Sequence, residues 1–250
     1  MVIKNNILLL ILAISMTTPV SIVYANDNAD GEEKNNLVVL LHGLARSDFS
    51  FKKMEKSLQD EGYRTCNVSY PSTKYPIEEL VSNYVLPYIE KCRGNIYQTI
   101  NFVTHSMGGI LVRYIATQKL KFKVGRVVML SPPNKGSEVV DTLGGLWLFQ
   151  AINGPAGLQL STNRESMPNT LGAAQFELGI ITGNQSINFI LSSMIEGDDD
   201  GKVSIESAKL EGMKDFLVIS ATHPFIMKNK VAIEQTKYFF ENSHFDHSKQ

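Results

Sequence analysis

Ser106 stands where an apolar run gives way to small residues. In the segment FVTHSMGG, residues 102–109, the run stops at this serine and a helical pattern follows. A serine in a tight strand-to-helix turn between small residues is typical of a nucleophile elbow, which exposes the hydroxyl above a sheet. Thr104 replaces the first glycine of the G-x-S-x-G pattern, so for this segment alone a plain connecting turn is the alternative. As a nucleophile, the hydroxyl would need a base and an orienting carboxylate.

His223 is the candidate base. It follows the last apolar run and precedes the final helical pattern, in the segment FLVISATHPFIMKN, residues 216–229. His244 and His247 lie in a polar tail with little to orient them. A histidine that follows a strand, downstream of the serine and of an acid, fits the base of a Ser…Asp…His arrangement. We therefore assign the role of general base to His223.

The candidate acid lies in the loop EGDDDGKVSIESAK, residues 196–209. Three consecutive aspartates are also typical of a solvated charge cluster or a calcium loop, and these are the alternatives. Consecutive side chains cannot all point inward, and Gly201 marks Asp200 as the residue at the turn. We predict Asp200 as the acid, with Asp198 as the second choice, and we assign no metal ligand.

The segment LLHGLARS, which closes the first strong apolar run, is expected to supply an oxyanion hole. Gly43 lets the backbone bend so that the amide of Leu44 faces the Ser106 hydroxyl. With the amide of Met107, the residue after the nucleophile, this gives two donors for a developing negative charge. His42 precedes the bend, and we expect it to organise the loop rather than to act as the base.

These candidates follow strands of one predicted sheet. Strand-like runs alternate with helical patterns, and most runs are continuously hydrophobic, as parallel strands covered on both faces should be. The alternation predicts a doubly wound, mostly parallel sheet flanked by helices, in a single α/β domain over residues 37–242. The strands are expected at 37–43, 65–71, 100–106, 126–133, 178–184 and 215–223, and the helices near 49–61, 76–92, 108–120, 137–150 and 229–242.

The N-terminus has the pattern of an export signal. Lys4 supplies a positive region, ILLLILAISM an apolar core, and Val23-Tyr24-Ala25 a cleavage site. We expect residues 1–25 to be removed as a signal peptide, 26–36 to form a flexible lead-in, and 243–250 to form a polar tail. The mature protein is then exported, to the periplasm or out of the cell.

Charge and cysteine content set two further expectations. With 24 basic and 25 acidic residues the net charge is −1, and no basic stripe indicates a nucleic-acid partner. The chain has two cysteines, Cys66 in a strand-like run and Cys92 near the end of a helical run. An oxidising compartment favours a disulfide between them, and two buried free thiols are the alternative.

Together these segments resemble the α/β-hydrolase superfamily and, within it, the lipase/esterase branch. The resemblance is carried by LLHGLARS, YPST, FVTHSMGGILVRY, LSPPNKGSE, DDDGKVSIESAK and THPFIM, in the expected order along most of the chain. It implies hydrolysis of a carboxylic ester through an acyl-enzyme, without a cofactor. The expected partners are a small ester or lipid substrate and, transiently, a lipid surface, with no obligate protein partner.

Substrate choice is expected to depend on residues 136–180. Within them, LGGLWLFQAI forms either a small cap or acyl-pocket wall, with Trp147 and Phe149 facing the substrate, or an amphipathic helix that covers the sheet. The alternatives to an esterase are an acyltransferase with the same triad, a peptidase, and a hydrolase-like binding protein without activity. The last would lack a triad member, and all three residue types are present.

Overall fold

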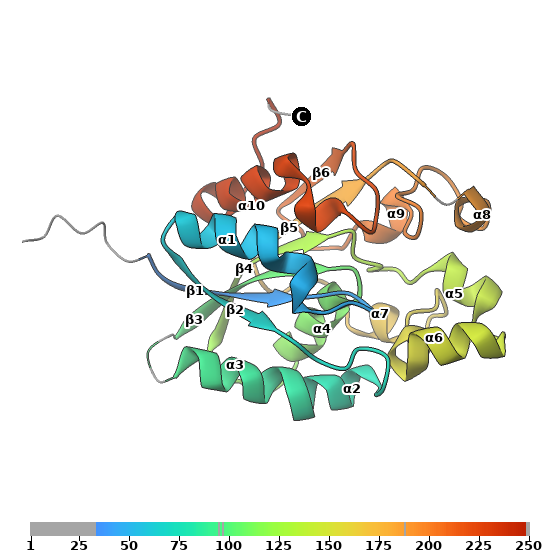
Figure 1. The fold of residues 1–250 in the computed structure, drawn as a ribbon, viewed down its shortest axis with the longest axis horizontal. Coiled ribbons are helices and arrows are strands. Elements are labelled where there is room, and N and C mark those ends of the chain that lie inside the picture. The colour runs from blue at the N-terminus through green and yellow to red at the C-terminus, as the bar shows by residue number, and fades with distance from the viewer. Residues whose placement is uncertain (1–33, 95, 97, 188, 249–250) are drawn as a thin grey trace, which may run out of the picture. The chain divides into compact units, whose positions relative to one another are not determined.

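A parallel sheet forms the centre of the computed structural model, which describes residues 34–94, 96, 98–187 and 189–248. Within these residues the sheet has six strands in the order β2-β1-β3-β4-β5-β6, and every neighbouring pair is parallel (Figure 1). The strands are β1 (Lys34–Leu41), β2 (Tyr63–Val68), β3 (Thr99–His105), β4 (Lys123–Leu130), β5 (Leu178–Gly183) and β6 (Asp215–Ile219). This confirms the predicted doubly wound α/β architecture.

Helices cover both faces of the sheet (Figure 1). The helical segments are η1 (Asp48–Phe51), α1 (Lys52–Asp60), α2 (Ile77–Leu80), η2 (Val81–Val85), α3 (Leu86–Arg93), α4 (Met107–Ala116), α5 (Glu138–Leu143), α6 (Trp147–Leu158), α7 (Met167–Thr170), α8 (Phe189–Ser192), α9 (Ile205–Ala208), η3 (Ile226–Lys228) and α10 (Lys230–Asn242). Helices α1 and α10 pack on one face, and α2, α3 and α4 pack on the other.

The continuous hydrophobicity of β1 follows from this two-sided burial. Val38 and Leu40 belong to the core beneath α1 and α10, whereas Val39 and Leu41 belong to the core beneath α2, α3 and α4. All four side chains are buried. Because successive strand residues point to opposite faces, a strand covered on both faces needs apolar residues at every position.

Several element boundaries differ from the sequence-based expectation. Strand β1 begins at Lys34, within the expected lead-in. Strands β4 and β6 end at Leu130 and Ile219, three and four residues before the expected ends. The apolar runs continue past the sheet because the loops that follow are themselves buried, so hydrophobicity alone does not mark the end of a strand. His223 accordingly lies in a loop rather than directly at a strand end.

The expected helix over residues 137–150 is two helices, α5 and α6. Helix α6 is itself broken at Gly154, which has a φ of 63° and precedes Pro155. A methyl group on Gly154 would collide with the carbonyl oxygen of Thr73 in the YPST loop. The break therefore lets α6 approach that loop closely.

Contacts outside the sheet hold two further parts of the described chain in place. A disulfide joins Cys66 in β2 to Cys92 in α3, as one of the two alternatives expected. The expected polar tail is anchored in residues 243–248, because Phe245 is buried and the ring of His247 forms a hydrogen bond to the carboxylate of Asp215. The tail's histidines are thus oriented, contrary to expectation.

No helix within the described part of the chain is long and apolar enough to cross a membrane, and the expected signal peptide lies outside the described residues.

Candidate active site

Ser106 occupies a strained turn between β3 and α4. Its φ is 52° and its ψ is −124°, a conformation that non-glycine residues rarely adopt. The backbone amide of Ser106 donates a 2.9 Å hydrogen bond to the Leu130 carbonyl at the end of β4, which fixes the turn against the sheet. A side chain at Gly108 would collide with the Leu41 carbonyl, and a Cβ on Gly109 would lie 2.9 Å from Pro132. The two glycines after the serine are therefore required by the close approach of helix and sheet.

The structure brings Ser106, His223 and Asp200 into one hydrogen-bonded chain. Nε2 of His223 lies 3.1 Å from Oγ of Ser106, and Nδ1 lies 2.8 Å from Oδ2 of Asp200. Since a carboxylate only accepts, the imidazole proton sits on Nδ1, and Nε2 accepts from the serine hydroxyl. The base can therefore receive the proton that the hydroxyl loses during nucleophilic attack.

Asp200 is the most deeply buried of the three residues. Its other oxygen accepts hydrogen bonds of 3.1 and 3.0 Å from the amides of Lys202 and Val203. Burial alone would raise the pKa of Asp200, but the adjacent His223 ring and these hydrogen bonds hold that pKa below its usual value. The carboxylate is therefore ionised when it orients the imidazole.

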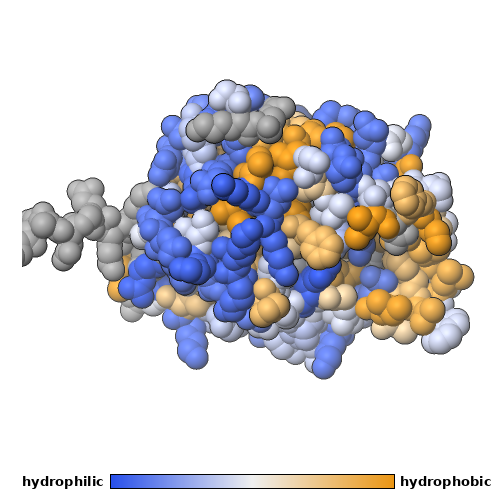
Figure 2. Space-filling model, turned by 45° about the horizontal axis from the view of Figure 1, so that its top comes forward, coloured by the Kyte–Doolittle hydropathy of each residue, from blue (hydrophilic) through white to orange (hydrophobic). Residues whose placement is uncertain are grey.

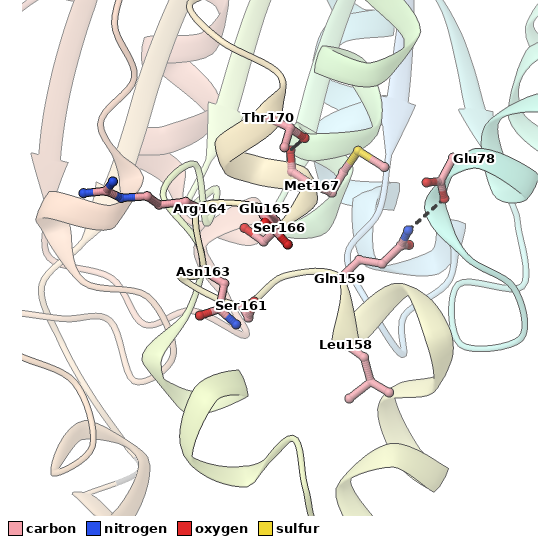
Figure 3. A pocket seen from close by; sticks show the side chains of 10 residues that line it. All are labelled: Glu78, Leu158, Gln159, Ser161, Asn163, Arg164, Glu165, Ser166, Met167 and Thr170. Carbon is pink, nitrogen blue, oxygen red and sulfur yellow. Dashed lines mark hydrogen bonds between the residues drawn. The ribbon is translucent and has the colours of Figure 1, made fainter.

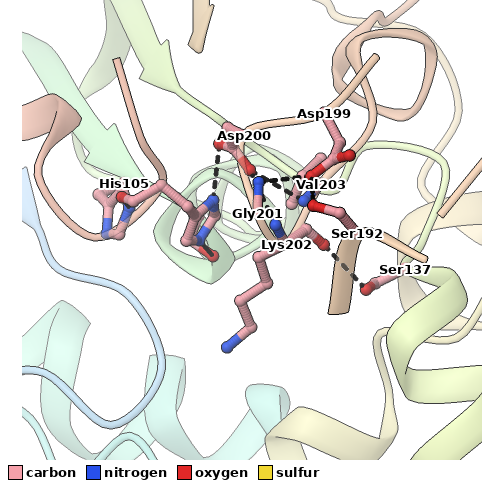
Figure 4. A network of polar contacts seen from close by, with 10 residues as sticks. His105, Ser137, Ser192, Asp199, Asp200, Gly201, Lys202 and Val203 are labelled. Atoms are coloured by element: carbon pink, nitrogen blue, oxygen red, sulfur yellow. Dashed lines mark hydrogen bonds and ion pairs between the residues drawn. The ribbon is translucent and has the colours of Figure 1, made fainter. Parts of the chain in front are cut away.

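The other two aspartates of the loop point elsewhere. Asp198 is exposed, and Asp199 accepts hydrogen bonds from Ser192 and from the amide of Gly201 (Figure 4). Gly201 has a φ of 98°, as the expected turn requires. Across the described ranges, no group of three or more His, Cys, Asp or Glu side chains is placed to hold a metal ion.

His105 is a site residue that the sequence analysis did not single out. Its Nε2–H donates a 3.0 Å hydrogen bond to the carbonyl of His223, and the two rings lie 4.8 Å apart. Burial holds the pKa of His105 well below its usual value, and the neighbouring His223 lowers it further, so this ring is neutral. The available signal was its place directly before Ser106, at the end of the central strand β3.

The loop after β1 is held by contacts to the YPST segment. The ring of His42 stacks on Tyr70 with centroids 3.9 Å apart, and its Nδ1–H donates to the Gly43 carbonyl. Burial lowers the pKa of His42. The amide of Ala45 donates to Oγ of Ser72. These contacts are those expected of a histidine that organises the loop.

The two amides expected to form the oxyanion hole are available. Within the described chain, neither the amide of Leu44 nor that of Met107 has a hydrogen-bond partner. A Cβ on Gly43 would lie 2.8 Å from Nδ1 of His105 and 3.1 Å from Cβ of Ser106. The glycine thus allows the loop to lie directly against the serine turn.

Ser106 lies between two small pockets. One, of 200 Å³, is lined by His223 and His105 together with Arg46, Ile187, Leu191 and Pro224, among others. The other, of only 20 Å³, is lined mainly by apolar side chains, including Val139, Val140, Phe149 and Leu160. Leu44 and Lys202 line both. A larger pocket of 720 Å³ lies away from the serine, between Glu78 and the 158–170 segment (Figure 3).

The residues expected to face the substrate behave differently from each other. Phe149 lines the smaller pocket beside Ser106, whereas the Trp147 side chain is 77% exposed. Other large apolar side chains of α6 and of the α8 region are exposed too, namely Leu146, Leu148, Ile152, Ile187, Phe189 and Ile190. Figure 2 shows hydrophobic surface gathered at the end of the molecule where α6 and α8 lie. Helix α6 is therefore not simply a cover for the sheet.

Solved structures with this fold include three hydrolases. The mature lipase BlEst2 of Bacillus licheniformis superposes with a TM-score of 0.61 at 18% identity, over 82% of this chain and 91% of the lipase. The metagenomic carboxyl esterase MGS0156 superposes with a TM-score of 0.56 at 17% identity, over 76% of this chain and 64% of the esterase. Phospholipase PlaB from Legionella pneumophila superposes with a TM-score of 0.55 at 15% identity, over 70% of this chain and 45% of the phospholipase. This chain therefore spans less than half of that protein. At such identities the likeness establishes the fold, which is that of the α/β-hydrolases.

The sequence itself matches a family model. The family described as "Putative serine esterase (DUF676)" matches residues 31–156, which include both the loop after β1 and the Ser106 turn. A comparison with curated protein sequences finds no match. By its sequence, and in agreement with its fold, the chain belongs to this serine esterase family.

Proposed function

We propose that this protein is an exported enzyme that hydrolyses carboxylic esters through an acyl-enzyme formed on Ser106. The observation that carries the proposal is the position of His223, whose two ring nitrogens bridge Oγ of Ser106 and the carboxylate of Asp200. A free serine hydroxyl is a poor nucleophile, and this arrangement gives it a base that is held in the useful tautomer.

In the first half of the reaction, Oγ of Ser106 attacks the ester carbonyl carbon while its proton passes to Nε2 of His223. The carbonyl oxygen becomes negatively charged, and the amides of Leu44 and Met107 stabilise it. The tetrahedral intermediate then expels the alcohol, which takes the proton from His223. Asp200 stays ionised and stabilises the imidazolium while it exists.

In the second half, water attacks the acyl-serine. His223 takes one proton from the water and returns it to Oγ of Ser106 as the acid leaves. The enzyme is then restored, and every proton that the base accepts is given back within the cycle. Both halves use the same three side chains and the same two backbone amides.

Export is proposed from the N-terminal pattern, with cleavage after Ala25. The disulfide between Cys66 and Cys92 supports it, because disulfides persist in oxidising compartments and are rare in a reducing cytosol. Intact-mass analysis of protein recovered from the periplasm or medium should give an N-terminus at Asn26. Recovery of exported protein that keeps residues 1–25 would contradict the proposal.

The catalytic proposal is tested with purified mature protein and a chain-length series of p-nitrophenyl esters. Ser106→Ala and His223→Ala should each remove most turnover, and the double variant should be little worse than either, because the residues act as a unit. A fluorophosphonate probe should label the parent and not Ser106→Ala. Release of free acid, measured in the presence of an alcohol, distinguishes hydrolysis from acyl transfer.

The choice of acid is tested by three matched amides. Asp200→Asn should lower kcat by about 10⁴-fold, because the asparagine no longer holds the imidazole in its useful tautomer. Asp198→Asn and Asp199→Asn leave the bond to His223 in place and should change kcat only a few-fold. Equal losses in all three variants, reversed by added calcium, would instead favour a calcium loop and overturn the assignment of Asp200.

Normal ester turnover by Ser106→Ala would overturn the whole mechanism.

A further inference from the structure

Two cationic side chains, Arg46 and Lys202, line the 200 Å³ pocket that also contains Ser106 and His223. Arg46 comes from the loop after β1, and Lys202 comes from the turn that carries Asp200. Neither has a hydrogen-bond or ion-pair partner for its charged group in the part of the chain that the structure describes. In Figure 4 the Lys202 side chain leaves the turn and ends away from the network of dashed contacts.

Within the described residues, the nearby carboxylate of Asp200 forms no ion pair with Arg46 or Lys202. Both oxygens of Asp200 are engaged, one by His223 and the other by the backbone amides of residues 202 and 203. Burial lowers the pKa of Lys202, and repulsion from Arg46 lowers it further, although Asp200 acts in the opposite direction. Arg46 is exposed and Lys202 is partly buried, so water screens the charge of Lys202 less, and an anion bound between the two side chains would stabilise both charges.

The position of His223 shows which part of an ester this pocket would receive. The base must pass its proton to the oxygen of the leaving alcohol, so the alcohol portion lies on the side of His223. His223 lines the 200 Å³ pocket and is absent from the lining of the 20 Å³ pocket. The smaller, mainly apolar pocket is then the one toward which the acyl chain points.

We propose that Arg46 and Lys202 form a subsite for a negatively charged group on the alcohol portion of the substrate. This inference rests on the proposed esterase function and narrows its substrate class. The rest of the pocket lining includes apolar Leu44, Ile187 and Leu191, which suits an alcohol with an apolar body and one anionic substituent. A carboxylate and a phosphate share this chemistry, and the guanidinium of Arg46 offers paired donors to either.

Three matched butanoate esters test the subsite. They are 3-(butanoyloxy)benzamide, 3-(butanoyloxy)benzoate and 3-(butanoyloxy)phenyl phosphate, which share the acyl group and a phenolic leaving oxygen but differ in charge. The measured quantity is the ratio of kcat/KM for each anionic ester to kcat/KM for the neutral amide. In the parent protein we expect both ratios to exceed one by about tenfold or more, in line with charge-assisted hydrogen bonds. The larger ratio identifies the preferred anion.

Variants locate the charge preference. Arg46→Gln and Lys202→Met should each lower the anionic-to-neutral ratio several-fold, and the double variant should bring it close to one. Arg64→Gln is the matched control, because Arg64 is exposed near the start of β2, whereas Ser106 follows the end of the parallel strand β3 and so lies at the opposite end of the strands. It removes the same charge and should keep the parent ratio. Added salt should lower the parent ratio and leave the double variant unaffected.

The pH dependence of the anionic-to-neutral ratio of kcat/KM shows whether the charge of Lys202 itself, rather than the overall charge of the protein, causes the preference. The charged and titratable groups around its ammonium are Arg46 and Asp200, together with the buried ring of His105. As Lys202 loses its proton, the preference for the anionic ester should fall, at a pH below that of an ordinary lysine. Lys202→Arg should remove this alkaline decline.

The outcomes distinguish the two proposals. Equal kcat/KM for neutral and anionic esters in the parent, with turnover still dependent on Ser106, would overturn the anionic subsite and leave the esterase proposal standing. An equal loss of the ratio in Arg64→Gln would also overturn it, because the effect would then arise from net charge. Absence of Ser106-dependent turnover with every ester would overturn the esterase proposal and the subsite together.

Discussion

The side chain of His105 is bonded to the backbone of His223: its Nε2–H donates a 3.0 Å hydrogen bond to the His223 carbonyl. The residue that directly precedes Ser106 is thus bonded to the residue proposed as its base. The loop that holds His223 has no strand pairing at this point, since β6 ends at Ile219. The bond therefore fixes the distance between the end of β3 and the base.

From this contact we predict a positioning role for His105. His105→Leu should lower kcat by about tenfold, as expected for the loss of one buried hydrogen bond, and change KM little. His105→Gln keeps an N–H at a similar reach and should recover most of kcat. Steady-state kinetics on both variants, with thermal unfolding as a check on folding, decide the matter. Equal kcat in the two variants would mean that the ring only fills space.

The buried histidines predict that stability falls in mild acid. The pKa values of His42 and His105 are lowered, chiefly by burial, so the unfolded chain binds these protons more readily than the folded chain. The free energy of unfolding should therefore decrease as the pH falls below about 6.5, by up to about 1.4 kcal/mol per pH unit for each proton. Urea unfolding between pH 7.5 and 5.5 measures this slope.

His105→Gln should flatten that slope, while His244→Gln, at an exposed position, serves as the control. The same slope in the parent and in His105→Gln would show that the His105 ring does not contribute to the acid response.

The bridge between Cys66 and Cys92 should contribute measurably to stability. It closes a loop with a sequence separation of 26 residues, for which the chain-entropy model gives about 3–4 kcal/mol. The double variant Cys66→Ser/Cys92→Ser should show a lower midpoint of urea unfolding, and reductant should lower the parent toward it without affecting the variant. Two alkylatable thiols in unfolded, unreduced exported protein would contradict the bridge.

The exposed apolar side chains beside the Ser106 pockets predict contact with a lipid surface. Trp147 is the only tryptophan, so its fluorescence reports its surroundings without interference. With phosphatidylglycerol or phosphatidylcholine vesicles, its emission should shift to shorter wavelength, and Phe189→Ser should weaken binding. Ile96→Ser is the matched control, since Ile96 is 69% exposed in the turn before β3, at the opposite end of this strand from Ser106. An unchanged emission spectrum at saturating vesicle concentration would exclude insertion of Trp147.

The fold was predictable because its strongest signals are local. Continuous apolar runs and a helical periodicity between them reflect burial of the sheet on both faces, as Val38 and Val39 illustrate. The strand ends were less accessible, because buried loop residues beyond Leu130 and Ile219 look like strand residues. The break in α6 depends on the approach of Gly154 to Thr73, a contact between distant segments that no local pattern encodes.

The candidate site likewise contains residues that the local sequence predicts and residues that it does not. Ser106 and His223 stand at positions where the sequence changes from apolar to turn-like, and Gly201 distinguished Asp200 from its two neighbours. His105 was overlooked because a buried, neutral histidine at the end of a strand resembles any core residue. Lys202 and Arg46 were overlooked as a pair because their relationship exists only where two loops meet.

The parallel strand order has a consequence for how the protein matures. Ser106 and His223 lie 117 positions apart, and the base reaches the serine only after β5 and β6 have been added beside β4. Contacts of such long range cost more chain entropy to form than local contacts do, and they slow folding. The growing or partly folded chain therefore carries a serine turn without its proton acceptor. Ester turnover would thus begin only after β6 has paired with β5, so the protein would be inactive until the sheet is complete.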